Sequence, residues 1–416
     1  MNNVFCADIG TSSLKTAVID SQGNVVSYSR QIFEKTAVHE ESSVWLKALK
    51  SAMDEIFASE KECRVDCIAI SGNGPTLVGE GGETLLWNAP VPPDCTRAFT
   101  SASLFVPRLY PFSKMFPDAW KSSARVFSGP EYLIYLLTGK ALTILPEKRF
   151  EEAYWTKGSL SEAGLDSGFQ KLPDFTSPSS SAGTLTANTA EFFAHQENGI
   201  VQGLPVFCGA PDFVAALVGT GTLSPGKLCD RAGSSEGLNL CTAEKIEAPG
   251  IRTLPSIIPG LWNASILLPD TGIKFSEYKK RLEEHEGRGM SYDEAVHETI
   301  FNDGMDAIYD QGKYMMLEIA MKIRDGLKVL EKAVAGTSTV FPDEFTIAGG
   351  QAGNQEWIKM KCDVTGMKAN IPVCHDAELM GDAVFAFTGA GVYKDIIEAS
   401  EKLCKFEGLM QGAFLA

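Results

Sequence analysis

The order of elements in the first seventy residues constrains the fold more than any other feature of the sequence. Short runs rich in β-branched residues occupy Val4–Ala7 and Lys15–Asp20, and a turn at residues 21–24 leads into a third run, VVSYSR. A helix is predicted over residues 45–57, where apolar side chains recur at three- and four-residue spacing, and the strand DCIAISG follows it. Three strands, a helix and a further strand are typical of a mixed sheet with a crossover helix. The sequence therefore predicts a layered α/β domain.

The last third of the chain predicts a second α/β domain. A long amphipathic helix is expected over residues 313–335, and the strand EFTIAGG, a helix, the strand ANIPV and a helix over about 378–390 follow it. Residues 173–190 are rich in Pro, Ser, Gly and Thr and predict a loop. Because the strand pattern restarts with VFCGA after this loop, we expect domains at 1–205 and 206–416.

Composition excludes several classes of protein. The 416 residues carry 37 Lys plus Arg against 53 Asp plus Glu, a formal charge of −16, which disfavours binding to a phosphate backbone. No apolar run is long enough to span a membrane, and MNNVFCADIG lacks the features of a signal peptide. The 10 cysteines include no CxxC pair and the 5 histidines match no zinc pattern. We expect reduced thiols and a cytoplasmic protein.

A faint internal repeat links the two halves of the chain. CADIGTSS at residues 6–13 and CDRAGSS at residues 229–235 both place a cysteine four residues before a glycine and a Ser/Thr run. Each lies where one strand is predicted to turn into another, although so few matches can arise by chance. Two such hairpins facing one another would line a cleft between the domains.

The first hairpin has the residue types that hold a phosphate and a metal. Backbone amides of a tight Gly-Ser/Thr turn can bind an anion. Lys15 adds a cation, and Asp8 suits Mg²⁺ or its waters. The alternative is an ordinary hairpin with a surface lysine.

The second hairpin also fits two unrelated motifs. GSSEG matches the nucleophile elbow of serine hydrolases, but an elbow needs a following helix and GLNLCTA predicts a strand. Gly221–Lys227 nearly matches a P-loop, but Leu228 replaces the Ser/Thr that would bind Mg²⁺. We therefore favour neither motif.

Two further positions follow predicted strands. Asp212 opens the helix DFVAALVG after the strand VFCGA, where it either caps the helix or accepts a hydroxyl proton during phosphoryl transfer. The glycine-rich run at 348–354 joins the strand EFTI to a helix, so its backbone can approach a ligand closely.

Four segments, in this order, resemble the FGGY family of carbohydrate kinases in the actin-like ATPase superfamily. They are DIGTSSLK, GAPDFVAALVGTG through AGSSEGLN, TIAGGQAGNQEWIKMKCDVTG and DAELMGDAVFAFTGAGVY. The resemblance implies two ribonuclease-H-like α/β domains with mixed sheets flanked by helices and a cleft between them. The first domain would hold the first phosphate loop and the sugar, and the second would hold the base, the second phosphate loop and the adenosine.

The resemblance also implies an ATP- and Mg²⁺-dependent sugar kinase, with Asp212 as general base and Asp8 organising the metal. Nucleotide contacts would come from Gly10, Thr11, Ser12, Lys15, Gly233, Ser234, Gly349, Gly350, Gln351 and Asn354. The partner would be a small sugar or polyol, such as a xylulose- or ribulose-like ketose or a glycerol-like polyol. Homodimers are common in the family.

The chain departs from the family on its sugar side. Trp87-Asn88-Ala89-Pro90 stands where relatives carry a Trp-Asn-Asp-x-Arg segment, and Asn73, Thr76 and Trp87 are our candidates for sugar contacts. The acceptor sugar and its hydroxyl are therefore not carried over. Two other hypotheses stay open: a catalytically inactive regulator that binds nucleotide and sugar, and a chaperone-like ATPase on the same scaffold.

Overall fold

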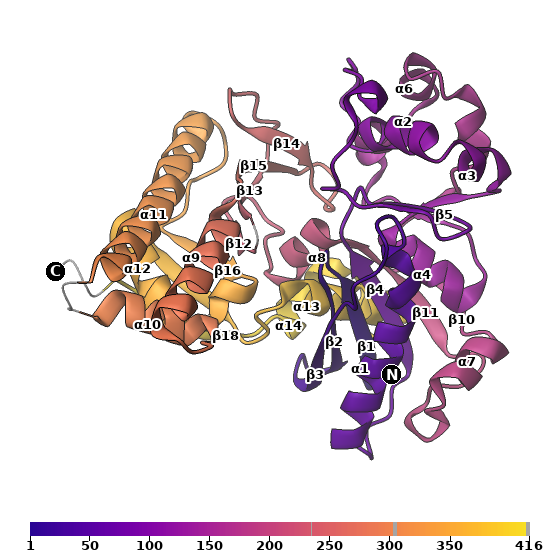
Figure 1. The fold of residues 1–416 in the computed structure, drawn as a ribbon, viewed down its shortest axis with the longest axis horizontal. Helices are drawn as coiled ribbons and strands as arrows, with labels where there is room; N and C mark the ends of the chain where they lie inside the picture. The colour runs from indigo at the N-terminus through magenta and orange to yellow at the C-terminus, as the bar shows by residue number, and fades with distance from the viewer. Residues whose placement is uncertain (234, 303–305, 413–416) are drawn as a thin grey trace. The chain divides into compact units, whose positions relative to one another are not determined.

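The computed structural model describes residues 1–412 except 234 and 303–305, and the chain divides into two compact units (Figure 1). Unit 1 comprises Met1–Gly219 and Glu378–Leu403, and unit 2 comprises Thr220–Ala377 and the segment from Cys404 onward. The boundary expected at residues 205 and 206 falls inside unit 1. The physical reason is strand pairing, because the strand that begins at residue 205 pairs with a strand of the first sheet.

Unit 1 is built on a six-stranded sheet with the order β10-β11-β4-β1-β2-β3. Its strands are β1 (Asn3–Ile9), β2 (Ser13–Asp20), β3 (Val25–Ile32), β4 (Cys67–Gly72), β10 (Ser181–Thr184) and β11 (Pro205–Pro211). β1 runs antiparallel to β2 and parallel to β4, and β4 runs parallel to β11. Helix α1 (Trp45–Ser59) lies between β3 and β4 in the chain, so the predicted order of elements is confirmed.

Helices cover both faces of this sheet. α1 and α4 (Gly129–Thr138) bury their apolar side chains on the face that includes Cys208, and α4 ends at Gly139 in a left-handed conformation. α8 (Asp212–Gly219) and α13 (Ala377–Gly389) pack against each other, since a Cβ on Gly381 would lie 2.1 Å from the Ala215 carbonyl oxygen. Ser400 of α14 (Ile396–Leu403) donates a hydrogen bond to α8.

Smaller elements of unit 1 lie between β4 and α8 in the chain. They are β5 (Leu77–Gly79), β6 (Thr84–Leu85), α2 (Val106–Met115), α3 (Pro117–Ser122), β7 (Val126–Ser128), β8 (Thr143–Ile144), α5 (Glu151–Tyr154), α6 (Lys157–Glu162), β9 (Phe175–Thr176) and α7 (Ala187–Phe193). β5, β6 and β7 form a small sheet of their own, and β8 pairs with β9.

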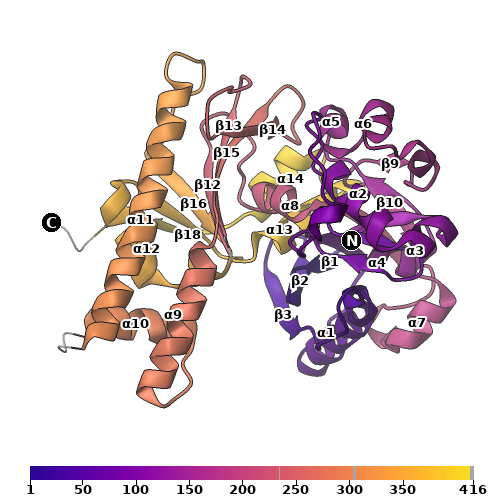
Figure 2. The same ribbon diagram turned by 45° about the horizontal axis from the view of Figure 1, so that its top comes forward.

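Unit 2 is built on a seven-stranded sheet with the order β14-β15-β13-β12-β16-β17-β18 (Figure 2). Its strands are β12 (Leu228–Ala232), β13 (Glu236–Thr242), β14 (Arg252–Pro255), β15 (Trp262–Leu268), β16 (Glu344–Ala348), β17 (Lys368–Pro372) and β18 (Phe406–Met410). Its helices are α9 (Thr271–Glu286), α10 (Tyr292–Phe301), α11 (Ala307–Val334) and α12 (Gln355–Thr365). Apolar residues of α11 and α12 form one buried cluster with β12, β13 and β16. The predicted long helix is confirmed as α11, although it begins earlier than expected.

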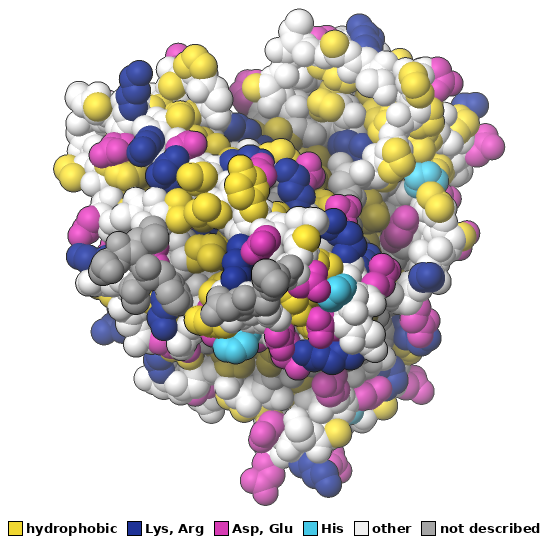
Figure 3. Space-filling view, turned by 60° about the vertical axis from the view of Figure 1, so that its left-hand side comes forward, with side chains coloured by type: hydrophobic (Ala, Val, Ile, Leu, Met, Phe, Trp, Pro, Cys, Tyr) yellow, Lys and Arg dark blue, Asp and Glu magenta, His cyan; other side chains and the backbone are white. Residues whose placement is uncertain are grey.

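Three features of the structure concern the expectations drawn from composition: membrane-spanning helices, surface charge and the cysteines. Among the described residues no helix is both long enough and apolar enough to cross a membrane. Basic and acidic side chains lie interspersed among hydrophobic ones on the face shown in Figure 3. Cys67, Cys208, Cys241 and Cys362 are buried free thiols.

Candidate active site

Three parallel strands of unit 1 end at the same edge of the sheet, and a candidate residue lies at each end. Ile9 at the end of β1 pairs with Gly72 of β4, and Gly72 pairs with Pro211 of β11. Asp8, Asn73 and Asp212 adjoin these paired residues. The carboxyl ends of parallel strands are where α/β sheets form ligand sites. Strand pairing thus brings together residues that are distant in the chain.

The β1–β2 turn, predicted as the first phosphate loop, has the expected form. The Gly10 amide donates to the Ser13 carbonyl oxygen at 2.9 Å, which closes the turn, and Thr11 and Ser12 are exposed. Lys15 lies opposite Asp8 on β2, and its ammonium nitrogen is 4.0 Å from a carboxylate oxygen of Glu378. The turn therefore presents two hydroxyl side chains to solvent beside a lysine.

Asp8 belongs to a buried group of carboxyl and hydroxyl side chains. The Ser71 hydroxyl lies 3.2 Å from an oxygen of Asp8 and 2.9 Å from an oxygen of Asp382. A serine hydroxyl has one hydrogen, so it donates a hydrogen bond to one carboxyl group and accepts a hydrogen bond from the other. Complete burial, with the charges of Asp8 and Glu378 nearby, raises the pKa of Asp382 well above its usual range. We therefore assign the proton of this group to Asp382.

Asp382 reaches Asp8 because α13 packs closely on β11. A Cβ on Gly209 would lie 2.3 Å from one Asp382 oxygen and 2.4 Å from a backbone oxygen of β4, so only glycine fits. Ser71 and Asp382 are site residues that were not predicted from the sequence. The available signal was an acidic residue inside the apolar run MGDAVFAF.

Asp212, the expected general base, is the first residue of α8 and is partly buried. One of its oxygens accepts a hydrogen bond from the Phe213 amide at 2.6 Å. A carboxylate at this position is stabilised by the positive end of the helix dipole. The residue was expected in the second domain, but it lies in unit 1 with the β1–β2 turn.

The three candidate sugar contacts are connected by hydrogen bonds. The Thr76 hydroxyl donates to the Asn73 side-chain oxygen at 2.5 Å and accepts from the Trp87 amide at 3.1 Å. Thr76 is completely buried, so its hydroxyl positions the other two residues. The Trp87 indole is 42% exposed and donates to the Thr11 hydroxyl at 3.0 Å. Trp87 therefore links these residues to the β1–β2 turn.

Unit 2 contains the other two predicted nucleotide segments. The phosphate hairpin consists of β12, β13 and the turn between them, in which the Gly233 amide donates to the Ser235 carbonyl oxygen at 3.0 Å. Ser234 lies outside the described residues. The turn leads into β13 rather than a helix, so it is not a nucleophile elbow.

The glycine loop, residues 349–354, follows β16 and lies directly against the phosphate hairpin. Gly349 has φ of 89°, and a Cβ there would lie 2.3 Å from the Ala232 carbonyl oxygen at the end of β12. β12 and β16 are parallel neighbours, so their carboxyl ends adjoin. This arrangement requires a residue without a side chain at Gly349.

The rest of the glycine loop connects to α12. Gly350 and Gln351 belong to a short 3₁₀ turn, and the Gln351 side-chain oxygen accepts a hydrogen bond from the Trp357 indole. Asn354 caps α12, since its side-chain oxygen accepts from the Trp357 amide at 2.8 Å. A surface hollow of about 580 Å³ includes Asn354 and residues of α10 such as Asp293. Five of the predicted nucleotide contacts, Gly233, Gly349, Gly350, Gln351 and Asn354, thus belong to adjoining segments of one unit.

A buried ion group lies between the phosphate hairpin and α12. The Lys361 ammonium, with no solvent exposure, is 2.9 Å from an oxygen of Asp230 and also contacts Glu236. Burial, together with the neighbouring Asp230, raises the pKa of Glu236, and a proton on Glu236 makes the group neutral. None of these three residues was predicted as a site residue, because nothing in the neighbouring sequence distinguishes them from surface charges.

Among the described residues no group of three or more His, Cys, Asp or Glu side chains is arranged to hold a metal ion. Mg²⁺ needs only one or two carboxylates, because phosphate oxygens and water supply its other ligands. Asp8 is a buried carboxylate beside a turn of the type that binds phosphate, and Asp382, which keeps its proton, is not counted as a ligand. This donor set fits Mg²⁺ bound together with a phosphate substrate.

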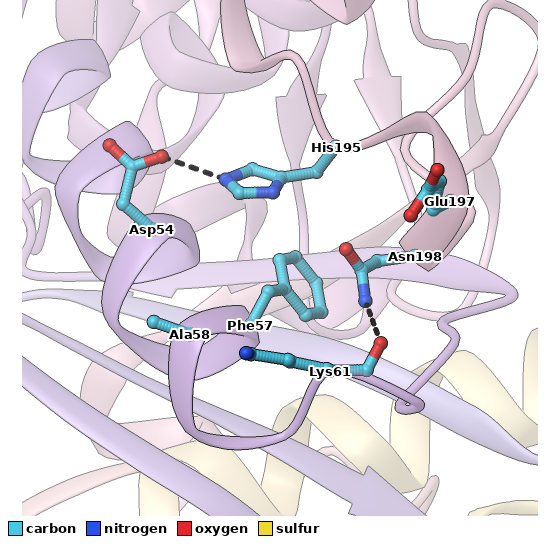
Figure 4. Close-up of a pocket in the computed structure, with 7 residues that line it drawn as sticks. All are labelled: Asp54, Phe57, Ala58, Lys61, His195, Glu197 and Asn198. Carbon is cyan, nitrogen blue, oxygen red and sulfur yellow. Dashed lines mark hydrogen bonds and ion pairs between the residues drawn. The ribbon is translucent and has the colours of Figure 1, made fainter.

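A second hollow of about 290 Å³ lies in unit 1 between α1 and residues 195–198 (Figure 4). A ring nitrogen of His195 is 2.7 Å from a carboxylate oxygen of Asp54. Burial opposes ionisation of Asp54, but hydrogen bonds from Lys50 and His195 outweigh it and lower the pKa of Asp54. None of the predicted site residues lines this hollow, and its polar contacts connect α1 to a neighbouring loop.

Comparison with curated proteins finds autoinducer-2 kinases among the sequence relatives. No family model matches the chain. An autoinducer-2 kinase from Escherichia coli (strain SMS-3-5 / SECEC) is 23% identical over 352 residues, which cover 74% of this chain but only 65% of the relative. An autoinducer-2 kinase from Klebsiella pneumoniae is 22% identical over 480 aligned residues, covering 97% of this chain and 88% of the relative.

Solved structures share the fold over nearly the whole chain. A xylulose kinase from Rhodospirillum rubrum has a TM-score of 0.75 at 16% identity and covers 99% of this chain and 94% of its own. A Plasmodium falciparum glycerol kinase with ADP has a TM-score of 0.72 at 14% identity, with coverage of 99% and 94%. The two-domain α/β fold predicted from the sequence is confirmed. The resemblance to carbohydrate kinases is confirmed as well.

Proposed function

We propose that this protein, which has the fold and the sequence relatives of FGGY carbohydrate kinases, transfers the γ-phosphoryl group of ATP to a hydroxyl of a small sugar or polyol. The observation that carries the proposal is the sheet edge of unit 1, where Asp8 lies near the end of β1 and Asn73 and Asp212 directly follow the neighbouring parallel strands β4 and β11. This edge combines a metal-binding carboxylate, a polar contact for the acceptor and a base.

In the proposed reaction Asp212 accepts the proton of the acceptor hydroxyl as its oxygen bonds to the γ-phosphorus. The bond from the γ-phosphorus to the bridging oxygen breaks, and ADP leaves with that oxygen. Lys15 and the backbone of the β1–β2 turn attract the phosphate oxygens. Asp8 would hold Mg²⁺, which when bound neutralises charge on those oxygens.

Unit 2 is assigned to the nucleotide. Gly233 and Ser234 of the phosphate hairpin would contact phosphate groups. Gly349, Gly350, Gln351 and Asn354 would contact the adenosine, since the glycine loop leaves its backbone open to a flat ligand. Autoinducer-2 is the first acceptor to test because it is named in the relatives, and xylulose, gluconate and glycerol follow from the structural neighbours.

The test uses Asp212→Asn and ATP consumption with each acceptor. Asparagine keeps the side-chain oxygen that accepts from the Phe213 amide but does not take up a proton, so kcat should fall by about 10²-fold or more. Asp118→Asn on α3 is the matched control, because Asp118 is exposed. Calorimetric ADP binding should be unchanged in both variants.

An Asp212→Asn variant with wild-type turnover would refute the role of the base. A wild-type protein that binds ADP but consumes ATP with none of the acceptors would favour the inactive regulator.

A further inference from the structure

We infer that Lys361 is a positioning residue that holds the phosphate hairpin and the glycine loop of unit 2 in one fixed arrangement for the nucleotide. The inference rests on the proposed function, because it assumes that these two segments bind ATP. It names a residue of α12 that would contact no substrate itself.

The first support is the placement of the two carboxylates that Lys361 contacts. Asp230 lies on β12 and Glu236 begins β13, so they flank the turn that contains Gly233. Their side chains share one face of the sheet, since Ala232 pairs with Glu236 and Asp230 pairs with Leu238. One ammonium thus contacts both strands at the base of the turn and limits how far they can move apart.

The second support is the connection from Lys361 to the glycine loop. The Lys361 ammonium lies 5.5 Å from the centre of the Trp357 ring, one helical turn earlier on α12, where a cation interacts favourably with an aromatic face. The Trp357 indole donates to the Gln351 side chain, and the Trp357 amide donates to Asn354. Two proposed adenosine contacts are therefore oriented by the residue that Lys361 contacts.

The third support is the free-energy cost of burying Lys361, Asp230 and Glu236, which makes these charges a poor choice if their only role is to stabilise the fold. A lysine and two carboxylates are each at least 99% buried, and Asp230 and Glu236 each keep one oxygen without a hydrogen-bond partner among the described residues. Well-packed apolar side chains often stabilise a core as well as buried ion pairs do. A positioning role accounts for charges at this place in the core.

The experiment compares Lys361→Met with a triple variant, Lys361→Met, Asp230→Asn and Glu236→Gln. The single variant leaves two acidic groups without their cation and should melt at a lower temperature. The triple variant removes all the charges and should recover most of the melting temperature. Lys328→Met is the matched control, because Lys328 is exposed on α11 in the same unit.

The readout is calorimetric ADP binding, together with KM values for ATP and the acceptor. Both Lys361 variants should bind ADP about tenfold more weakly, the effect of a misplaced hydrogen bond to a charged ligand. KM for ATP should rise in parallel, while KM for the acceptor should stay within about twofold, because the acceptor residues lie in unit 1.

Recovery of ADP binding in the triple variant along with its melting temperature would overturn the inference, because Lys361 would then be purely structural. Wild-type ADP binding in a folded single variant would also overturn it. A wild-type protein that binds no ADP would instead refute the proposed function, so the two failures are distinguishable.

Discussion

Replacing Glu131 with glutamine should remove a loss of stability that the wild type suffers as pH rises. Glu131 lies in the first turn of α4 and is 2% exposed. One of its oxygens accepts from the Ile144 amide at 2.8 Å, and the other has no hydrogen-bond partner among the described residues. Burial raises the pKa of Glu131 to about 7, although the hydrogen bond from Ile144 lowers it in part.

The sign of the effect follows from which state holds the proton. Between pH 4.5 and about 7 the folded protein keeps the Glu131 proton while the unfolded chain has released it. The free energy of unfolding therefore falls as pH rises through this window, and the contribution of Glu131 is lost above it. A difference of about 2.5 pH units, at about 1.4 kcal/mol per unit, gives a loss of about 3 kcal/mol.

The assay is urea unfolding of wild type and Glu131→Gln at pH 5 and pH 8. Glutamine resembles the protonated acid, so the two proteins should have similar stability at pH 5. At pH 8 the variant should be more stable by about 3 kcal/mol. The difference in the free energy of unfolding between variant and wild type at each pH cancels the contributions of the other titrating groups.

The control is Glu152→Gln, at an exposed position on α5 in the same unit. Its stability should follow the wild type at both pH values. The reasoning is refuted if Glu131→Gln and wild type lose the same stability between pH 5 and pH 8, because Glu131 would then titrate alike in the folded and unfolded chains.

Two glycine substitutions should be destabilising because a side chain has no room. Gly349→Ala places a Cβ 2.3 Å from the Ala232 carbonyl oxygen at a positive φ, so the melting temperature and the affinity for ADP should both fall. Unchanged ADP binding would contradict the close approach of the glycine loop to the phosphate hairpin. Gly209→Ala places a Cβ 2.3 Å from a carboxyl oxygen of Asp382, so α13 should shift and its backbone amides should exchange hydrogen faster. Amide exchange in α13 as slow as in the wild type would show that the helix accommodates the methyl group.

Local sequence patterns predicted elements in the first seventy residues and the last third of the chain and both glycine-rich hairpins, but residues 173–190, expected as a loop, contain β9, β10 and the start of α7. Apolar spacing identified α1 and α11, and glycine followed by hydroxyl residues identified the β1–β2 turn. Such signals depend on side chains within a few positions of one another, so they can be recognised in the sequence without the structure. The same locality explains why the domain boundary was misplaced, since the pairing of β11 with β4 joins distant segments.

Only the tertiary structure brought together the polar groups around the candidate site. Ser71 lies 63 residues from Asp8 and 311 residues from Asp382 in the chain, yet its hydroxyl contacts both. Lys361 lies 131 residues from Asp230 and 125 residues from Glu236. The sequence by itself determined which strands, turns and helices form, because those choices are local. Packing determined which buried charges meet, because burial changes the proton affinity of a carboxyl group only when its neighbours are in place.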